Sequence, residues 1–286
     1  MLVPMVTGLL YMTPKRKIKS YDLSNKELSI QVHLSGLSFC ILDRIENKII
    51  GIVHENFNQN VTPDILEEKL RAELHDHNTL KLLRKLHLIH SNELSAFVPD
   101  ALFNKECLSD YLKFNIKILE NDVVVYDEIP QADLKNVYIP YMNITNYLFE
   151  LYGSFEYKHA ATLLVEKLLS KGLPYGEPVM YVDISDTHFE IVVINKRKLI
   201  YYNSFNYETA EDFIYYVLFA VEQLGMDSNT LTFRFLKHID EEDMKYRFAY
   251  KYIKNIVLPN EKIGYSHSEK ISKEALHDAH LLTSVF

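Results

Sequence analysis

The feature that most constrains the fold is a pattern of residues that recurs about 150 positions later in the chain. Residues 29–57 read SIQVHLSGLSFCILDRIENKIIGIVHENF, and residues 179–205 read VMYVDISDTHFEIVVINKRKLIYYNSF. With this shift, Val32 aligns with Val182 and Phe39 aligns with Phe189. An internal repeat predicts two copies of one structural unit within the 286 residues.

Each copy is predicted to form three consecutive strands followed by a helix. The strands are rich in alternating apolar residues, and the polar stretches 43–48 and 195–198 are typical of hairpin turns. The first helix is expected to begin at Thr62, because the next residue is proline. The second is expected to begin near Thr209, with an aspartate three positions on, and to end at Gly225.

Beyond these helices, each copy is expected to continue with a strand, a helix and a short strand. The ranges are 93–99, 100–116 and 123–125 in the first copy, and 230–236, 240–252 and 256–258 in the second. The predicted unit is therefore β-β-β-α-β-α-β, present twice. Connecting helices are expected at 143–152 and 158–171, followed by the glycine- and proline-containing stretch 171–176. The predicted organisation is an N-terminal arm (1–22), a first domain with the connecting helices (23–175), a second domain (176–258) and a C-terminal tail (259–286).

Composition excludes several classes of protein. Eight glycines are about 3% of the chain, against about 7% in an average protein, and loops that cradle phosphates depend on glycine. The net charge of −8 lacks the positive field that attracts a phosphate backbone, so no nucleic-acid partner is expected. No GxSxG, GxxxxGK[ST] or GxGxxG motif is present, and so the sequence gives no support for a nucleophilic hydrolase, a P-loop enzyme or a dinucleotide-dependent oxidoreductase.

Several features predict a cytoplasmic protein. The two cysteines, Cys40 and Cys107, form no CxxC pair, which favours a reducing compartment. No run of about 18 apolar residues is present, so we expect no membrane insertion. The apolar segment at the N-terminus precedes its positive charges, which is the reverse of a secretory signal, and a translation start at Met5 or Met12 is the simpler interpretation.

A doubled unit of this kind resembles the actin-like ATPase superfamily, which includes sugar kinases, heat-shock-70-type chaperones, actin, and the pilus and division proteins PilM and FtsA. More closely, the chain from about Leu23 to Leu258 looks like a domain-of-unknown-function family of Bacteroidetes with that fold. Three segments carry this impression: VPDALF (98–103), VYIPYMNI (137–144) and YVDISDTHFEIVV (181–193). The resemblance implies an α/β fold of two ribonuclease-H-like units in an actin-like arrangement.

The resemblance also implies where a nucleotide site would lie. Members that hydrolyse ATP hold its phosphates with two hairpin turns and hold Mg²⁺ with an acidic residue beside them. The corresponding cofactor-binding positions here are Ser35, Gly36, Asp183, Ser185 and Thr187. The first turn keeps one glycine but has His33 at the acidic position, whereas the second keeps the acidic residue but has no glycine. Asp186 would add a carboxylate near a bound phosphate, and like charges at ~4 Å repel by ~1–4 kcal/mol.

These departures favour a degenerate nucleotide site with no catalytic residue and no cofactor. The leading hypothesis is a non-catalytic protein that binds another protein, with a homodimer as one form of that assembly. The alternative is an ATP hydrolase or small-molecule kinase that uses ATP, Mg²⁺ and Asp183. Nucleotide binding without hydrolysis lies between the two.

Two further patterns leave alternatives open. The aromatic residues crowded between positions 138 and 157 predict either ordinary packing or a surface for a protein partner. They are Tyr138, Tyr141, Tyr147, Phe149, Tyr152, Phe155 and Tyr157. Near the C-terminus, Glu274, His277 and His280 follow i, i+3, i+6 spacing. We interpret them as part of a solvated polar tail rather than as metal ligands, because the i+6 position turns away from the shared face.

Overall fold

The computed structural model describes residues 23–57, 59–74, 80–171, 178–259 and 264–286. It divides into two compact units, which are treated separately below. The first unit comprises Met1–Glu128, Lys135–Leu163 and Ile263–Phe286, and the second comprises Ile129–Leu134 and Leu164–Lys262. The predicted N-terminal arm and most of the glycine- and proline-containing stretch at 171–176 lie outside the described residues.

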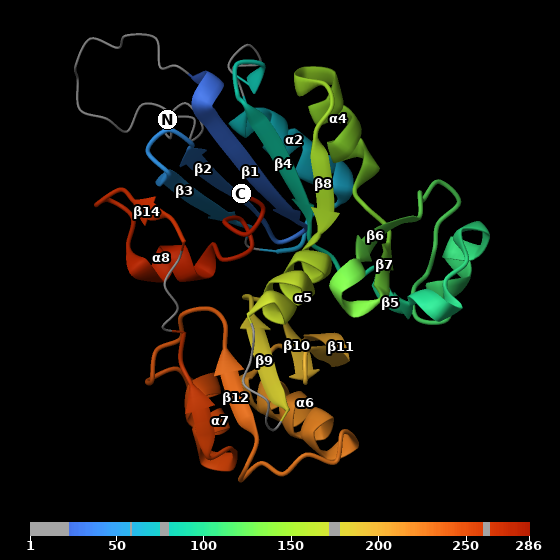
Figure 1. Ribbon diagram of the computed structural model, residues 1–286, viewed down its shortest axis with the longest axis vertical. Helices are drawn as coiled ribbons and strands as arrows, with labels where there is room; N and C mark the ends of the chain where they lie inside the picture. The colour runs from blue at the N-terminus through green and yellow to red at the C-terminus, as the bar shows by residue number, and fades with distance from the viewer. Residues whose placement is uncertain (1–22, 58, 75–79, 172–177, 260–263) are drawn as a thin grey trace. The chain divides into compact units, whose positions relative to one another are not determined.

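The first unit is built on a six-stranded sheet with the order β14-β3-β2-β1-β4-β8 (Figure 1). Its strands are β1 (Lys26–His33), β2 (Gly36–Asp43), β3 (Lys48–Asn56), β4 (Lys85–His90), β8 (Glu156–His159) and β14 (Ser266–His267). The three strands predicted within 29–57 are confirmed as the antiparallel meander β1–β2–β3. Strands β1, β4 and β8 run parallel, so their carboxyl ends meet at one edge of the sheet.

Two helices cover one face of this sheet, α2 (Pro63–Glu73) and α4 (Met142–Tyr152). Leu66 and Leu70 of α2 are fully buried and pack in the same core as Ile30 of β1. Helix α2 begins as predicted, because the Thr62 hydroxyl accepts the N–H of Ile65 at 3.4 Å. Packing of this apolar helix face onto the sheet is what stabilises the unit.

The C-terminal residues pack against the opposite face of the sheet. Ser29, which alternates with the core-facing residues of β1, donates its hydroxyl hydrogen to the carbonyl of Leu282 at 2.8 Å. Four apolar residues of this segment are buried, Leu276, Ala279, Leu281 and Leu282, and α8 (Lys273–Asp278) provides the first of them. Of the three residues interpreted as part of a solvated polar tail, Glu274 is exposed and His277 is half-buried, but the interpretation is wrong for His280, which is buried. His280 is buried because it lies within the run of buried residues Ala279–Thr283.

A separate three-stranded sheet has the order β5-β7-β6. Its elements are β5 (Ser95–Pro99), β6 (Val125–Ile129) and β7 (Leu134–Tyr138), with short 3-10 helices η2 (Asp100–Leu102), η3 (Lys105–Tyr111) and η4 (Pro130–Ala132). Most of its residues belong to the first unit, whereas Ile129–Leu134, which includes η4, belongs to the second. The expected helix at 100–116 is wrong, because η2 has only three residues and η3 is interrupted at Cys107, which departs from helical geometry (φ −126°, ψ 32°).

The fourth and fifth strands of the first main sheet are β4 and β8, not the predicted 93–99 and 123–125. Residues 85–90 (KLHLIH) form a strand whose side chains are buried on both faces of the sheet. Such a strand lacks the alternation of polar and apolar residues by which a half-exposed strand is recognised in a sequence.

The second unit repeats the same strand order as β11-β10-β9-β12-β13. Its strands are β9 (Val179–Ile184), β10 (His188–Asn195), β11 (Lys198–Asn206), β12 (Thr232–Phe235) and β13 (Asn255–Val257), and its helices are α6 (Ala210–Gln223) and α7 (Met244–Tyr252). Helix α5 (Ala160–Ser170) runs from the residues of the first unit into those of the second. The predicted capping box of α6 is confirmed, because Thr209 and Asp212 each accept the other's backbone N–H.

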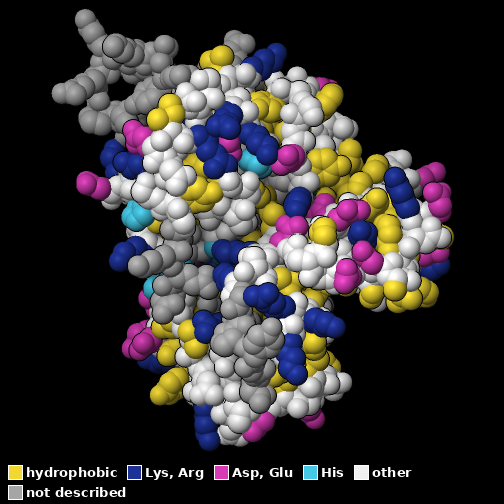
Figure 2. All heavy atoms as spheres, viewed as in Figure 1, with side chains coloured by type: hydrophobic (Ala, Val, Ile, Leu, Met, Phe, Trp, Pro, Cys, Tyr) yellow, Lys and Arg dark blue, Asp and Glu magenta, His cyan; other side chains and the backbone are white. Residues whose placement is uncertain are grey.

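The aromatic residues between 138 and 157 belong mainly to the core of the first unit. Tyr138, Tyr141 and Tyr147 are buried, which confirms the packing interpretation for them, whereas Phe149 is exposed. Figure 2 shows acidic and basic side chains intermixed on the visible face. None of the described helices is long and apolar enough to cross a membrane.

Candidate functional site

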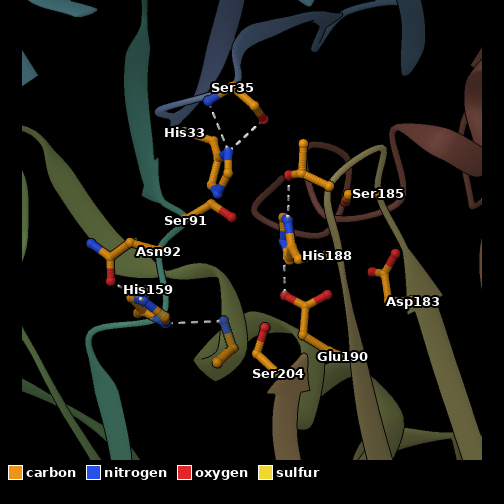
Figure 3. Close-up of polar contacts among 12 residues, drawn as sticks. His33, Ser35, Ser91, Asn92, His159, Asp183, Ser185, His188, Glu190 and Ser204 are labelled. Atoms are coloured by element: carbon orange, nitrogen blue, oxygen red, sulfur yellow. Dashed lines mark hydrogen bonds and ion pairs between the residues drawn. The ribbon is translucent and has the colours of Figure 1, made fainter. Parts of the chain in front are cut away.

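The turn between β1 and β2 satisfies its own hydrogen-bonding groups (Figure 3). The Ser35 N–H donates to Nδ1 of His33 at 3.0 Å, and the Ser35 hydroxyl lies 2.6 Å from the same nitrogen. The carbonyl of Ser35 accepts the N–H of Phe57 at 2.7 Å, and that of Leu34 accepts the N–H of Val61 at 2.9 Å. The backbone donor that a phosphate would need in this turn is therefore already bound to His33.

Gly36 is required by contact between strands. A Cβ atom at this position would lie 2.5 Å from the backbone carbonyl oxygen of Glu55 in β3. Any side chain here would push β2 and β3 apart. The one glycine retained in the first turn thus has a packing role, which the sequence alone could not distinguish from a role at a phosphate.

The turn between β9 and β10 is closed in a similar way. The Ser185 N–H donates to the carbonyl of His188 at 2.8 Å. Tyr207, just after β11, donates its hydroxyl hydrogen to the carbonyl of Ser185 at 2.7 Å and its N–H to the carbonyl of Thr187 at 3.2 Å. The first of these hydrogen bonds closes the turn, and the other two hold it against Tyr207 at the end of β11.

Asp183, at the position expected to hold a metal, forms an ion pair with a lysine. The carboxylate is almost fully buried, and its Oδ1 atom lies 2.8 Å from Nζ of Lys237. The same ammonium donates to the hydroxyl of Ser185 at 3.0 Å. Lys237 reaches this point because β12 runs parallel to β9, with Phe235 beside Val182, so the residues that follow the two strands meet.

His188 and Glu190 line the same strand, β10, and both are buried. Nε2 of His188 lies 3.9 Å from the Glu190 carboxylate, and Nδ1 of His188 lies 3.4 Å from the Thr187 hydroxyl (Figure 3). Within the described ranges, no group of three or more His, Cys, Asp or Glu side chains could hold a metal ion.

A second buried polar cluster lies in the first unit, around Asp127 and His159. The Asp127 carboxylate accepts hydrogen bonds from the Thr162 hydroxyl at 2.7 Å, the His159 N–H at 2.9 Å and the Tyr138 hydroxyl at 3.1 Å. Burial nevertheless raises the pKa of Asp127 above its ordinary value. Nδ1 of His159 accepts the N–H of Ala161, so its Nε2–H faces the Asn92 side-chain oxygen at 3.3 Å.

The structure divides the five predicted nucleotide-binding residues between the units. Ser35 and Gly36 belong to the first unit, and Asp183, Ser185 and Thr187 belong to the second. In the second unit, Asp183 and Ser185 share Lys237 as a partner, and Ser185 and Thr187 share Tyr207. Lys237, His188 and Glu190 were not among the predicted site residues. Lys237 lies two residues after β12, which runs parallel to β9 with Phe235 beside Val182, and this register is the signal that could have revealed it.

The comparisons with known proteins agree on the fold. A crystal structure from Bacteroides thetaiotaomicron, described as a protein with actin-like ATPase fold and unknown function, matches with a TM-score of 0.75 and 19% identity, over 86% of this chain and 95% of that one. The PilM–PilN type IV pilus biogenesis complex matches with a TM-score of 0.54 and 10% identity, over 90% of this chain and 97% of that one.

A third structure, the ethanolamine utilization protein EutJ from Carboxydothermus hydrogenoformans, matches with a TM-score of 0.46 and 9% identity, over 91% of this chain and 89% of that one. No curated protein matches the chain. The family model described as "Protein of unknown function (DUF3822)" matches residues 15–256. The chain therefore belongs to this family of unknown function, and its fold is the α/β, ribonuclease-H-like fold of the actin-like ATPases.

Proposed function

We propose that the chain is a non-catalytic member of the actin-like ATPase fold that works in the cytoplasm by binding another protein. In this proposal the residues of its two strand turns stabilise the fold and do not bind a nucleotide. These residues include Ser35, Gly36, Asp183, Ser185 and Thr187. The similar strand orders of the two units support an origin by internal duplication.

The observation that carries the proposal is the ion pair between Lys237 and Asp183. A Mg²⁺ ion needs a carboxylate oxygen and would have to displace this ammonium or lie beside it. Two positive charges on the metal near one on the lysine repel by about 8 kcal/mol at 4 Å and an effective dielectric constant of about 20. The residues present therefore do not fit an ATP–Mg²⁺ site, and we derive no reaction through one.

Protein binding is supported by analogy of fold. The structure that matches over 97% of its chain is described as the PilM–PilN type IV pilus biogenesis complex. The alternative function, an ATP hydrolase or kinase, rests on the retained carboxylate of Asp183. The ion pair of this carboxylate with the Lys237 ammonium argues against that function.

The test is partner capture by cross-linking and affinity purification in cells that express the tagged chain. We compare the wild-type chain with the double variant Asp183→Asn/Lys237→Met, which removes both charges of the pair. The proposal predicts that the same partner is recovered with both chains, at similar yield and regardless of added ATP. A partner that is lost from a folded double variant, or that is released by ATP, would favour the nucleotide-dependent alternative.

A further inference from the structure

Helices α6 and α7 form one layer on the sheet of the second unit. Phe213 and Val217 of α6 are buried in the same core as Ala249 of α7, and the two helices contact each other. Helix α6 connects β11 to β12, and α7 connects β12 to β13. These three strands run in one direction, because β9 and β11 are both antiparallel to β10 whereas β12 is parallel to β9 and to β13. Both helices therefore run opposite to the strands and parallel to each other.

The outward face of α6 is aromatic. Tyr215 and Phe219 lie two positions before and two positions after the buried Val217, so each is turned about 160° away from it. Their rings stack with centroids 6.4 Å apart, and the two residues are 63% and 44% exposed. Glu211 and Glu222 are exposed one turn before and one turn after this pair, and the helix has no basic residue. Exposed aromatic side chains that form a continuous patch are typical of an interface.

The outward face of α7 is basic and has the same spacing. Arg247 and Lys251 lie two positions before and two positions after the buried Ala249, and both are exposed. The helix has no acidic residue. Arg247 forms an ion pair with Glu242, which precedes the helix, but its side chain remains 53% exposed. Nζ of Lys251 lies 5.3 Å from the centroid of the Tyr252 ring on the same helix. Both cations are therefore accessible to a second molecule.

The aromatic pair of α6 and the basic pair of α7 lie at similar heights along the layer. Phe213 of α6 and Tyr246 of α7 both contact the ring of Phe235, with centroids 6.5 Å and 6.2 Å away. Tyr215 is two residues beyond the first contact and Arg247 is one residue beyond the second, a difference of about 1.5 Å along the helix axes. The second member of each pair follows four residues later, so it too lies at a similar height.

These heights and charges decide how two copies of the chain can meet through this layer. With a two-fold axis parallel to the helices, α6 of each copy lies on α7 of the other and runs in the same direction. Tyr215 then faces Arg247 of the second copy. Phe219 faces Lys251 of that copy. With an axis across the helices, α6 would lie on α6 and α7 on α7, and like charges would meet in both contacts. Charge complementarity therefore selects the first arrangement.

We propose that a second copy of this chain binds to this layer, forming a homodimer in which α6 of each copy packs on α7 of the other. Each aromatic ring of the outward face of α6 then has a cation of the second copy over it, an attraction that strengthens when the pair is shielded from water. The two-fold symmetry makes every such contact twice. The proposal does not depend on the state of the nucleotide site or on what else the chain binds.

The test is sedimentation velocity of the full chain from about 1 to 100 μM. The wild type is expected to sediment as a dimer of the 33.5 kDa chain in this range. Phe219→Lys is expected to weaken the dimer at least about tenfold, because the new lysine faces Lys251 in both contacts. Ile65→Lys is the matched control, because Ile65 of α2 is 43% exposed and lies in the first unit. This control is expected to leave the dimer unchanged.

Charge exchange tests which residues face each other. Lys251→Glu is expected to weaken the dimer, because a carboxylate then lies over the Phe219 ring. Phe219→Lys and Lys251→Glu together in one chain are expected to restore the dimer, because the new lysine faces the new glutamate of the second copy. Circular dichroism spectra like that of the wild type show that each variant is folded. A wild type that stays monomeric at 100 μM overturns the proposal. So does a dimer that neither single variant weakens, or one that the double variant does not restore.

Discussion

Nζ of Lys237 lies 2.8 Å from Oδ1 of Asp183, at the end of the central strand of the second sheet. The carboxylate is almost completely buried, and the lysine side chain is 21% exposed. A buried carboxylate needs a compensating charge, and in this fold a lysine of the same chain supplies it. Asp183, at the position expected to hold a metal ion, is therefore part of a structural ion pair.

The first prediction follows from that pair. Lys237→Met is expected to lower the free energy of unfolding by about 3 kcal/mol at pH 7, because it removes the ammonium that compensates a buried charge. The double variant Lys237→Met/Asp183→Asn is expected to recover most of this loss. Urea unfolding measures both, with Lys254→Met as an exposed-lysine control. Equal stability of the wild type and Lys237→Met would show that the pair contributes nothing.

The second prediction concerns Gly36. Gly36→Ala places a Cβ 2.5 Å from the Glu55 carbonyl oxygen and is expected to lower the free energy of unfolding by about 2 kcal/mol. Gly264→Ala is the control, because nothing lies within 4 Å of a Cβ there and the change is expected to stay within about 0.5 kcal/mol. If Gly36 served a phosphate instead, its alanine variant would keep its stability and lose affinity for ATP.

The third prediction concerns the buried carboxylate of Glu27. Burial raises the pKa of Glu27, but Arg44, with two nitrogens each 2.8 Å from the carboxylate oxygens, and His87 together hold the pKa below its ordinary value. Arg44→Leu is expected to lower the free energy of unfolding by about 3 kcal/mol at pH 7. Lys113→Leu, which removes an exposed pair with Asp110, is expected to change it by less than about 1 kcal/mol.

The sign of the pH dependence at Glu27 is fixed by its lowered pKa. The stabilisation is fully present above the ordinary value of 4.5 and is lost as the pH falls through the folded-state value. The difference between the wild type and Arg44→Leu is therefore expected to shrink below pH 4.5 in unfolding experiments. A difference that stays constant down to acid pH would show that Arg44 acts only by packing.

The fourth prediction is a loss of stability in mild acid caused by two buried histidines. Burial lowers the pKa of His90 and of His159 to about 3, from an ordinary value of 6.5. Between pH 6.5 and pH 3 the unfolded chain binds more protons than the folded chain. As the pH is lowered through this range, the free energy of unfolding therefore decreases by up to about 1.4 kcal/mol per pH unit for each histidine. Burial raises the pKa of Asp127, which acts in the opposite direction.

The measurement is urea unfolding at pH 7, 6 and 5 for the wild type and His90→Gln. The variant is expected to show a shallower decline, because one of the two groups has been removed. His238→Gln, at an exposed position, serves as the control and is expected to parallel the wild type. Parallel curves for all three proteins would show that His90 does not couple stability to pH.

The sequence predicted the strands of both meanders and the starts of α2 and α6, because alternation and helix caps are local signals. It missed β4 and β8 because these strands are buried on both faces or very short. Their assignment to the sheet depends on parallel pairing between distant segments. The main sheet of the first unit was therefore correct in its first three strands and wrong in its last two.

At the candidate site, too, the sequence did not reveal contacts between residues that are far apart along the chain. The sequence identified Asp183 and both turns, since a resemblance of motif is enough to locate them. It did not identify Lys237, which lies 54 positions further along and reaches the carboxylate only through the register of β12 with β9. The packing role of Gly36 likewise depends on the approach of Glu55 from another strand.

The most direct test of the central claim is a calorimetric titration of the purified chain with ATP and Mg²⁺, on the wild type and on Lys237→Ala. We expect no heat of binding to the wild type at millimolar nucleotide, because Lys237 holds the carboxylate that the metal would need and the N–H groups of Ser35 and Ser185 are already hydrogen-bonded. Micromolar binding to the wild type that is lost in Asp183→Asn would contradict the account.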